Sequence, residues 1–162
     1  MSAYRVRQAT LGDAETLVHH RVAMFRDMAV AIDAAAVEEA FGRWLRTAMA
    51  SGAYRAWVVE AQTHGIVAGG GVTVIPWPPG PRYLAGCVGF VYNVYTEPAH
   101  RRRGLARLIM DAIHAWGRDA GVTAFALNTS ADGRPLYESL GYGQTPYPMM
   151  FSVLPSAPEA TE

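Results

Sequence analysis

The sequence predicts one α/β domain, in which helices flank a central mixed (α+β) sheet. In the N-terminal half, two segments with apolar residues at helical spacing precede two segments rich in β-branched residues. The C-terminal half runs strand, helix, strand, the order of a right-handed crossover between parallel strands. With 162 residues and 51% apolar composition, the chain can bury one core without metals or disulfides. We expect a single domain over residues 1–154 and a disordered tail over 155–162.

The first elements are a short strand and two helices. Residues 4–9 alternate as a strand does, and Thr10 with Asp13 has the layout of a capping box, so a helix should begin near Leu11. The second helix has a regular apolar stripe and should end at Ser51 and Gly52. The stripe of the first helix consists of Leu17, Arg21 through its aliphatic stem, Met24, Phe25 and Met28. That of the second consists of Val37, Ala40, Phe41, Trp44, Leu45, Ala48 and Met49.

The middle of the chain is predicted to form the sheet. Residues 54–61 and 65–75 read as two antiparallel strands with a turn between them. The proline-rich segment 76–82 should be an exposed connection, because proline lacks the N–H that a central strand needs. Residues 85–96 are apolar on both faces, as expected of a central strand that is covered on each side.

The C-terminal part should contain a second α/β pair. A helix from Leu105 to near Gly121 and a strand over residues 122–128 follow from the apolar pattern. A short helix is expected over 133–140, with Asp132 as its cap and Gly141 as its end. Residues 148–154 read as a closing strand.

Composition narrows the classes of partner and compartment. The 14 basic residues balance the 14 acidic ones, so the overall field gives no reason to expect nucleic acid or an anionic membrane as a partner. The single cysteine, Cys87, cannot form an internal disulfide, which fits a reducing compartment. The N-terminus lacks the layout of a signal peptide, and no apolar run reaches the ~18 residues of a membrane span. We expect a soluble cytoplasmic protein.

Arginines gather around the predicted start of the helix at Leu105. Cations at a helix N-terminus are disfavoured by roughly 0.3 to 1 kcal/mol each, so the arrangement is reasonable if an anion binds there. Gly104 lets backbone amides approach a phosphate, and the segment follows a central strand, where ligands of α/β proteins bind. The alternative is a solvated basic turn. The cluster consists of Arg101, Arg102, Arg103 and Arg107.

The same segment resembles a family signature. Residues 101–106, RRRGLA, fill the pyrophosphate-binding pattern (Q/R)xxGx(G/A) of the GCN5-related N-acetyltransferases (GNAT), with Pro98 before them and LYESLGY about thirty residues later. The resemblance covers nearly the whole chain. It implies the GNAT fold, with parallel strands that splay at a cofactor cleft. It also implies direct transfer of the acetyl group of acetyl-CoA to an amine of a small molecule or peptide, without a metal. Dimers are common among such proteins, so a homodimer is a further expectation.

In that family, the backbone of the central strand pairs with the pantetheine arm of coenzyme A. By position the resemblance assigns this role to Val94, Tyr95 and Thr96, one of whose amides would hold the thioester oxygen. The pyrophosphate would bind the turn made by Arg101, Arg102, Arg103, Gly104, Leu105, Ala106 and Arg107. Ser130 and Gly133 stand where many members have Asn and Ala, so Asn128 or Ser130 is expected to supply a replacement contact.

The resemblance assigns the general acid to Tyr137, which would protonate the departing thiolate. The alternative for Tyr137 is a core aromatic on a short helix. Glu97 is the nearest carboxylate for the base, although it equally fits a solvated loop residue that faces the arginines. Tyr95, Asn93 and a water relay compete for that role, and an amine of low pKa needs no strong base.

The sequence offers fewer candidate residues for the acceptor pocket than for the cofactor site. Asn93, a lone amide in an apolar strand, is either a structural anchor or a substrate contact. Tyr92 and Tyr95 should point to opposite faces of their strand, so at most one of them should line the pocket. Phe41 fits an apolar lid or the core. An acidic pocket for polyamines or aminoglycosides has only a hint in Asp33, Glu38 and Glu39.

Other chemistries lack a motif. The histidines have no metal-binding spacing, and His19 and His20 should lie on a helix surface. Cys87 lies in a predicted strand without groups that would activate it, and no phosphate loop is present. Two rivals remain: a non-catalytic CoA-binding sensor or scaffold of the same fold, and a nucleic-acid binder that uses the arginine turn.

Overall fold

The computed structural model describes residues 3–146 and 149–153, and the chain divides into two compact units, residues 1–130 and 131–162. The expected single domain over 1–154 therefore stays a prediction. The expected tail, residues 155–162, lies outside the described residues.

The first unit contains a five-stranded mixed sheet in the order β1-β2-β3-β4-β5. Its strands are β1 Tyr4–Gln8, β2 Tyr54–Ala61, β3 Gly65–Pro76, β4 Cys87–Thr96 and β5 Phe125–Leu127. Each of the first four strands pairs antiparallel with its neighbour, while β4 and β5 are parallel. The predicted mixed sheet is confirmed, although β5 is shorter than the expected strand 122–128.

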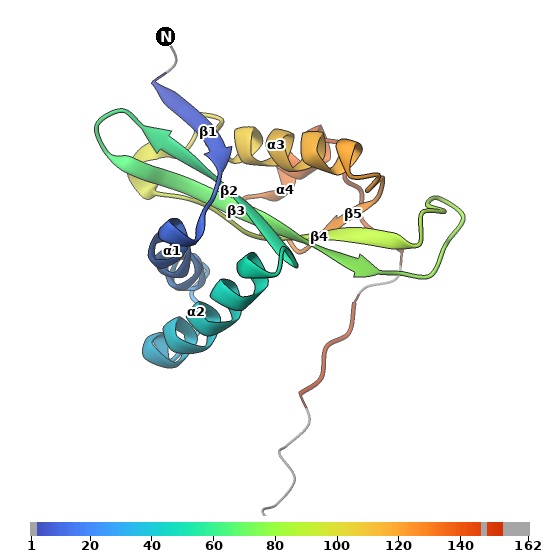
Figure 1. Cartoon of the computed structure of the whole chain (residues 1–162), viewed down its shortest axis with the longest axis horizontal. Helices are drawn as coiled ribbons and strands as arrows, with labels where there is room; N and C mark the ends of the chain where they lie inside the picture. The colour runs from blue at the N-terminus through green and yellow to red at the C-terminus, as the bar shows by residue number, and fades with distance from the viewer. Residues whose placement is uncertain (1–2, 147–148, 154–162) are drawn as a thin grey trace, which may run out of the picture. The chain divides into compact units, whose positions relative to one another are not determined.

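Helices cover both faces of this sheet (Figure 1). One face carries α1 Ala14–Asp27, preceded by the 3-10 turn η1 Leu11–Asp13, and α2 Ala34–Ala50; the other carries α3 Leu105–Asp119. The predicted capping box is present: the Asp13 carboxylate accepts from the backbone N–H of Thr10 at 2.7 Å and from its hydroxyl at 3.1 Å. Asp13 also pairs with Arg7 at 2.8 Å, which lowers its pKa to about 2 and ties the start of α1 to β1.

The core beneath α3 fixes the position of that helix on the sheet. Leu105, Ile109, Met110 and Ile113 are at most 2% exposed. Burial of each such side chain stabilises the fold by roughly 1.5 to 3 kcal/mol. α3 lies directly against β3, since a Cβ on Gly70 would lie 2.9 Å from Cγ2 of Ile109.

The helix that follows β5 belongs to the second unit. α4 spans Arg134–Ser139, as expected, but its N-cap is Gly133, without a side-chain cap. The prediction that Asp132 caps this helix is wrong, because the helix begins one residue later than a cap at 132 requires. The α4 residue Tyr137 packs edge-on against Tyr142, with ring centroids 5.9 Å apart.

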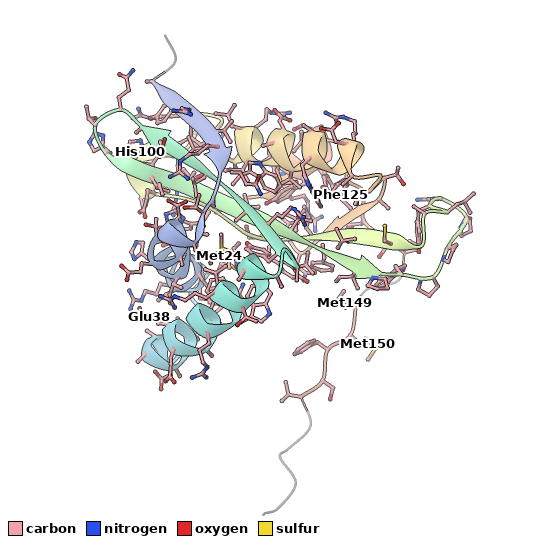
Figure 2. All side chains as sticks on the ribbon, viewed as in Figure 1. Met24, Glu38, His100, Phe125, Met149 and Met150 are labelled. Atoms are coloured by element: carbon pink, nitrogen blue, oxygen red, sulfur yellow. The ribbon has the colours of Figure 1, made fainter. Side chains whose placement is uncertain are left out.

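The predicted closing strand is absent from the part of 148–154 that the structure describes. Residues 149–153 have no strand assignment, and Met149 and Met150 are labelled in Figure 2. The exposed fractions of Met149, Met150, Phe151 and Val153 are 62%, 94%, 88% and 80%. Apolar composition alone predicted this strand, and a strand also needs a partner for its backbone groups.

Candidate active site

The central feature of the site is a bulge in β4 at Asn93. Gly69 pairs with Tyr95 and Gly71 pairs with Tyr92, so two residues of β4 lie opposite Gly70. Asn93 has a φ of 58°, in the left-handed region that Asn adopts more readily than most residues. The extra residue re-aims the side chains that follow it.

Because of this bulge, Tyr92 and Tyr95 face the same side of the sheet. Tyr92 packs against the core cluster beneath α1 and α2, and the ring of Tyr95 lies 5.0 Å from that of His20 in α1. The prediction that they point to opposite faces is wrong, since strict alternation does not hold across a bulge. Both tyrosines therefore belong to the face that α1 covers.

β4 loses its partner on one side at this point. It pairs with β5 only at Gly89, Phe90 and Val91, so within the described chain no strand continues the sheet on that side of Val94, Tyr95 and Thr96. A sheet edge of this kind presents backbone N–H and C=O groups to a ligand. These are the residues for which a ligand-facing backbone was expected, and they end at the arginine turn.

The arginine turn connects β4 to α3 through the 3-10 turn η2, Pro98–His100. Gly104 caps α3 with a φ of 79°, and Arg102 has a φ of 62°. A Cβ on Gly104 would meet nothing within 4 Å, so the backbone angle, rather than lack of space, explains the glycine. The first amides of a helix have no partner within the helix, which makes the start of α3 suited to an anion.

Two arginines of the turn make side-chain contacts with other elements of the first unit. The guanidinium of Arg101 pairs with Asp27 at the end of α1, and its Nε donates to the carbonyl oxygen of Thr96 at 2.9 Å. Nη1 of Arg103 donates to the hydroxyl of Tyr4 at 3.0 Å. These contacts hold the turn against β4 and β1, and the carboxylate of Asp27 offsets part of the repulsion among the arginines.

Glu97, the predicted base, lies between two histidines of α1. Its Oε1 is 3.3 Å from Nε2 of the exposed His19 and 3.5 Å from Nε2 of His20. His20 is only 1% exposed, and neither ring nitrogen has a hydrogen-bond partner among the described residues. Burial, with a smaller effect of His19, lowers the pKa of His20 to about 4. The prediction that both histidines lie on the helix surface holds for His19 and is wrong for His20.

Asn93 joins β4 to α1 through a residue that the sequence did not single out as part of a site. Its Oδ1 accepts a hydrogen bond from Nη1 of Arg21, and its Nδ2 donates to the hydroxyl of the buried Tyr54 at 3.4 Å. The Arg21 guanidinium lies 4.7 Å from the ring centroid of Phe25 and 5.1 Å from that of Phe41. The only signal for Arg21 was its place in an otherwise apolar helical stripe.

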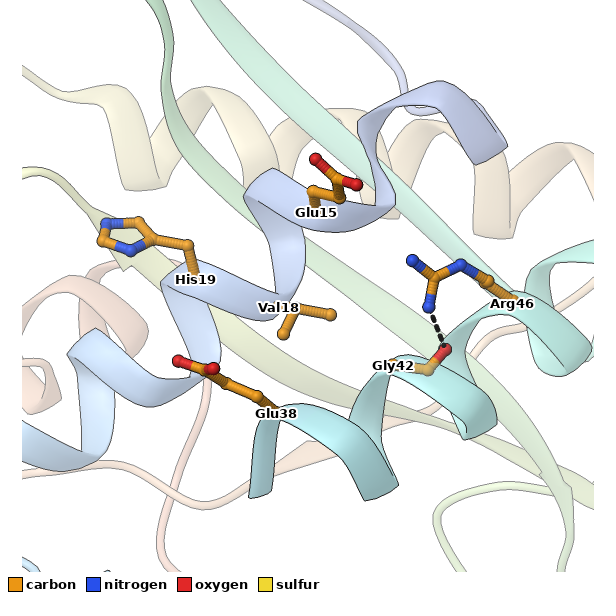
Figure 3. A pocket seen from close by; sticks show the side chains of 6 residues that line it. All are labelled: Glu15, Val18, His19, Glu38, Gly42 and Arg46. Atoms are coloured by element: carbon orange, nitrogen blue, oxygen red, sulfur yellow. Dashed lines mark hydrogen bonds between the residues drawn. The ribbon is translucent and has the colours of Figure 1, made fainter. Parts of the chain in front are cut away.

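A groove between α1 and α2 encloses about 270 Å³ (Figure 3). Of the three acidic residues that hinted at an acidic pocket, only Glu38 lines it: Asp33 caps α2, and Glu39 pairs with Arg43. The lining residues are Glu15, Val18, His19, Glu38, Gly42 and Arg46. The groove therefore carries charges of both signs.

The remaining predicted site residues follow β5, the last strand of the sheet, in the sequence. Asn128 and Ser130 are exposed and directly follow β5. Gly133 and Tyr137 belong to the second unit, where burial raises the pKa of Tyr137 to about 12. A tyrosine with this pKa is protonated at neutral pH, as a proton donor must be.

A known protein family matches most of the chain. The model of the acetyltransferase (GNAT) family matches residues 21–142. The chain belongs to the GNAT family. A GCN5-related N-acetyltransferase from Ralstonia eutropha JMP134 has a similar structure, with a TM-score of 0.84 and 32% identity over 93% of this chain and 98% of that one. A predicted acetyltransferase from Clostridium acetobutylicum, solved with acetyl-CoA, aligns with a TM-score of 0.82 and 24% identity over 92% of this chain and 96% of the other.

Relatives named for an activity match a smaller part. Aminoglycoside N(6')-acetyltransferase type 1 of Acinetobacter haemolyticus is 32% identical over 68 residues, which is 40% of this chain and 47% of the relative. The enzyme of the same name from Salmonella typhimurium is 29% identical over 70 residues, 39% of this chain and 48% of the relative. The alignments thus span about half the length of these relatives.

Two further findings concern the described residues alone. They contain no group of three or more His, Cys, Asp or Glu side chains placed to hold a metal ion. None of the helices within 3–146 and 149–153 is both long and apolar enough to cross a membrane.

Proposed function

We propose that the protein is an N-acetyltransferase that moves the acetyl group of acetyl-CoA directly to an amine of a small molecule. The observation that carries the proposal is the backbone of Val94, Tyr95 and Thr96. Among the described residues it has no strand partner beyond Val91 on the β5 side, and it leads into the N-terminus of α3. An open strand edge fits the amide-bearing pantetheine arm, and a helix N-terminus with nearby arginines fits a pyrophosphate. Membership of the GNAT family supports the same reading.

When bound, acetyl-CoA supplies an activated thioester. A backbone amide of residues 94–96 would hold the thioester oxygen as negative charge develops on it. The amides of residues 102–107, with Arg102 and Arg107, would bind the pyrophosphate, and Asn128 or Ser130 would add a contact. Arg101 and Arg103 keep the turn in place through Asp27 and Tyr4.

The residues of the chain also account for the protons. The neutral amine forms a C–N bond to the acetyl carbon and the C–S bond breaks. We assign the general acid to Tyr137, which would give its proton to the leaving sulfur. We assign the proton of the attacking amine to Glu97, whose carboxylate is 29% exposed at the end of β4 and so remains reachable from solvent.

The first test is a melting curve with and without acetyl-CoA. At about a hundredfold over the dissociation constant, binding adds about 2.7 kcal/mol, which raises the melting temperature by about 5 to 11 °C for a chain of this size. Gly104→Ala should weaken this shift, because a side chain is strained at a φ of 79°. Gly86→Ala is the matched control, since Gly86 has a φ of 72° in the β3–β4 connection.

Release of free thiol from acetyl-CoA across a panel of amines then tests catalysis. Turnover with at least one amine supports the transferase. Binding of acetyl-CoA without turnover across the panel would favour a CoA-binding sensor or scaffold. The absence of any melting shift would contradict the proposed cofactor site.

A further inference from the structure

Arg21 is a half-buried cation on α1, packed between that helix, α2 and the sheet. The described chain contains no carboxylate in ion-pair contact with it, whereas Arg7, Arg43 and Arg101 each have one. Burial lowers the pKa of Arg21, because partial removal from water disfavours the charged guanidinium. An anion stabilises a cation that is partly removed from water, so the guanidinium is suited to an anionic group from outside the fold.

The guanidinium lies against neutral side chains from both helices and from the sheet. Phe25 of α1 and Phe41 of α2 flank it, with Asn93 and Tyr92 on β4 and Tyr54 on β2 as its polar neighbours. The aromatic rings restrict the plane of the guanidinium, and Asn93 occupies one of its N–H donors. A fork of N–H groups that is held in this way suits the two oxygens of a carboxylate or phosphate.

The position of Arg21 relates it to the proposed chemistry. It contacts β4 at Asn93, two residues before Tyr95, whose backbone lies in the segment proposed to hold the thioester. The bulge adds a residue to β4 here, so these two residues advance along the strand by less than the roughly 7 Å of a regular strand. A small acceptor that carries its amine and its anionic group at opposite ends therefore suits this separation.

We propose that Arg21 binds an anionic group, a carboxylate or a phosphate, on the acceptor amine. This inference rests on the proposed function and assigns its substrate class. Asn93 orients the guanidinium, and Phe41 covers it from α2, which gives both residues a place in the acceptor pocket. The bulge at Asn93 is what brings this amide, rather than an apolar side chain, to the α1 face of β4.

The groove between α1 and α2 would favour a cationic acceptor, in contrast to the anionic acceptor proposed for Arg21. Glu15 and Glu38 line it and would attract a polycationic acceptor, such as the aminoglycosides named for two relatives. Arg46 and His19 line the same groove and weaken that attraction, and the groove is not built on β4. The two preferences lead to opposite rankings of acceptors, so one assay separates them.

The assay is thiol release from acetyl-CoA with acceptors in matched pairs. Glycylglycine is compared with glycylglycinamide, and glucosamine 6-phosphate with glucosamine, so that the two pairs distinguish a carboxylate from a phosphate; kanamycin represents the polycations. We expect kcat/KM for the anionic member of at least one pair to exceed that of its neutral partner by about tenfold to a hundredfold, the range for a hydrogen-bonded charged group. A preference for kanamycin, or equal rates within both pairs, would overturn the inference.

Variants separate binding from a structural role. Arg21→Gln should raise KM for the preferred anionic acceptor by about tenfold or more and leave its neutral partner unchanged, while Arg21→Lys should restore part of the preference. Arg26→Gln, at an exposed position on the same helix, should change neither. An equal loss for every acceptor would mean that Arg21 only supports the fold.

A binding measurement keeps the inference independent of turnover. The measurement follows the Nε–H NMR signal of Arg21 in the CoA-saturated protein, which is assigned as the signal that disappears in Arg21→Lys. N-acetylglycylglycine, its amide and N-acetylglucosamine 6-phosphate are added in separate titrations. We expect the signal to move with an anionic probe and to stay in place with the amide. A silent signal with every anion refutes the role of Arg21, whereas a moving signal without turnover of any amine contradicts the transferase alone.

Discussion

Acidification should destabilise the protein through His20. Its pKa is lowered from 6.5 to about 4, chiefly by burial, so the folded chain keeps this ring neutral at pH values where the unfolded chain binds a proton. Stability from this group is therefore complete above pH 6.5 and falls as the pH approaches 4. At 1.36 kcal/mol per pKa unit, the whole displacement corresponds to roughly 3 kcal/mol. At about pH 5 the loss is about 2 kcal/mol, or a melting temperature lower by about 4 to 8 °C.

The assay compares melting temperatures between about pH 8 and pH 5 at constant ionic strength for the wild type, His20→Gln and His19→Gln. The fall for the wild type should exceed that for His20→Gln by the amount given above, and His19→Gln should retain most of it. His114, whose pKa is also lowered by burial, titrates in all three proteins and cancels in the difference. Parallel curves for the wild type and His20→Gln would refute the reasoning. A gain in stability on acidification would show that the Glu97 carboxylate, 3.5 Å away, outweighs burial.

Three further substitutions test the catalytic groups and the sheet. Tyr137→Phe should lower kcat by about 10² to 10⁴ while CoA affinity is retained, and Tyr142→Phe, at its ring neighbour, should keep kcat; an unchanged kcat in Tyr137→Phe contradicts the assigned acid. Glu97→Gln should lower kcat by a similar factor of about 10² or more near neutral pH and recover part of it at higher pH, where more amine is unprotonated; a wild-type rate at neutral pH excludes Glu97 as the base. Gly71→Ala should destabilise the fold by about 1 to 3 kcal/mol in urea unfolding, because the new Cβ would lie 2.5 Å from the carbonyl oxygen of Arg55; unchanged stability would mean that β2 and β3 separate freely.

Much of the fold follows from local patterns in the sequence. The stripe on α3 predicts its buried face because helical spacing alone places Ile109 and Ile113 on one side, and the end of that helix follows from Gly121, which has a φ of 75°. The capping box at Asp13 is likewise a contact between residues close in sequence. Such elements are predictable because neighbours along the chain determine them.

The site is less predictable because it depends on pairing between strands. The bulge at Asn93 reflects the register of β4 on β3, which no alternation pattern records, and it reverses the expected direction of Tyr95. His20 is buried because β4 runs beneath α1, although an adjacent pair of histidines reads as helix surface. Arg21 has the sequence spacing of a core residue, so the sequence suggests that its aliphatic stem merely covers the core. Only the structure shows that the guanidinium has no acidic partner in the described chain.

Within the described chain, β4 has no strand partner on the β5 side after Val91, so its backbone groups there are available to another molecule. An unpaired strand edge is a template onto which a β-forming segment of another molecule can add, and such addition begins aggregation. A ligand that hydrogen-bonds along Val94, Tyr95 and Thr96 would occupy the same backbone groups and block that route. Preparations without coenzyme A should therefore lose soluble protein faster at high concentration than preparations that contain it. The cofactor would then protect the native sheet from aggregation in addition to its role in the reaction.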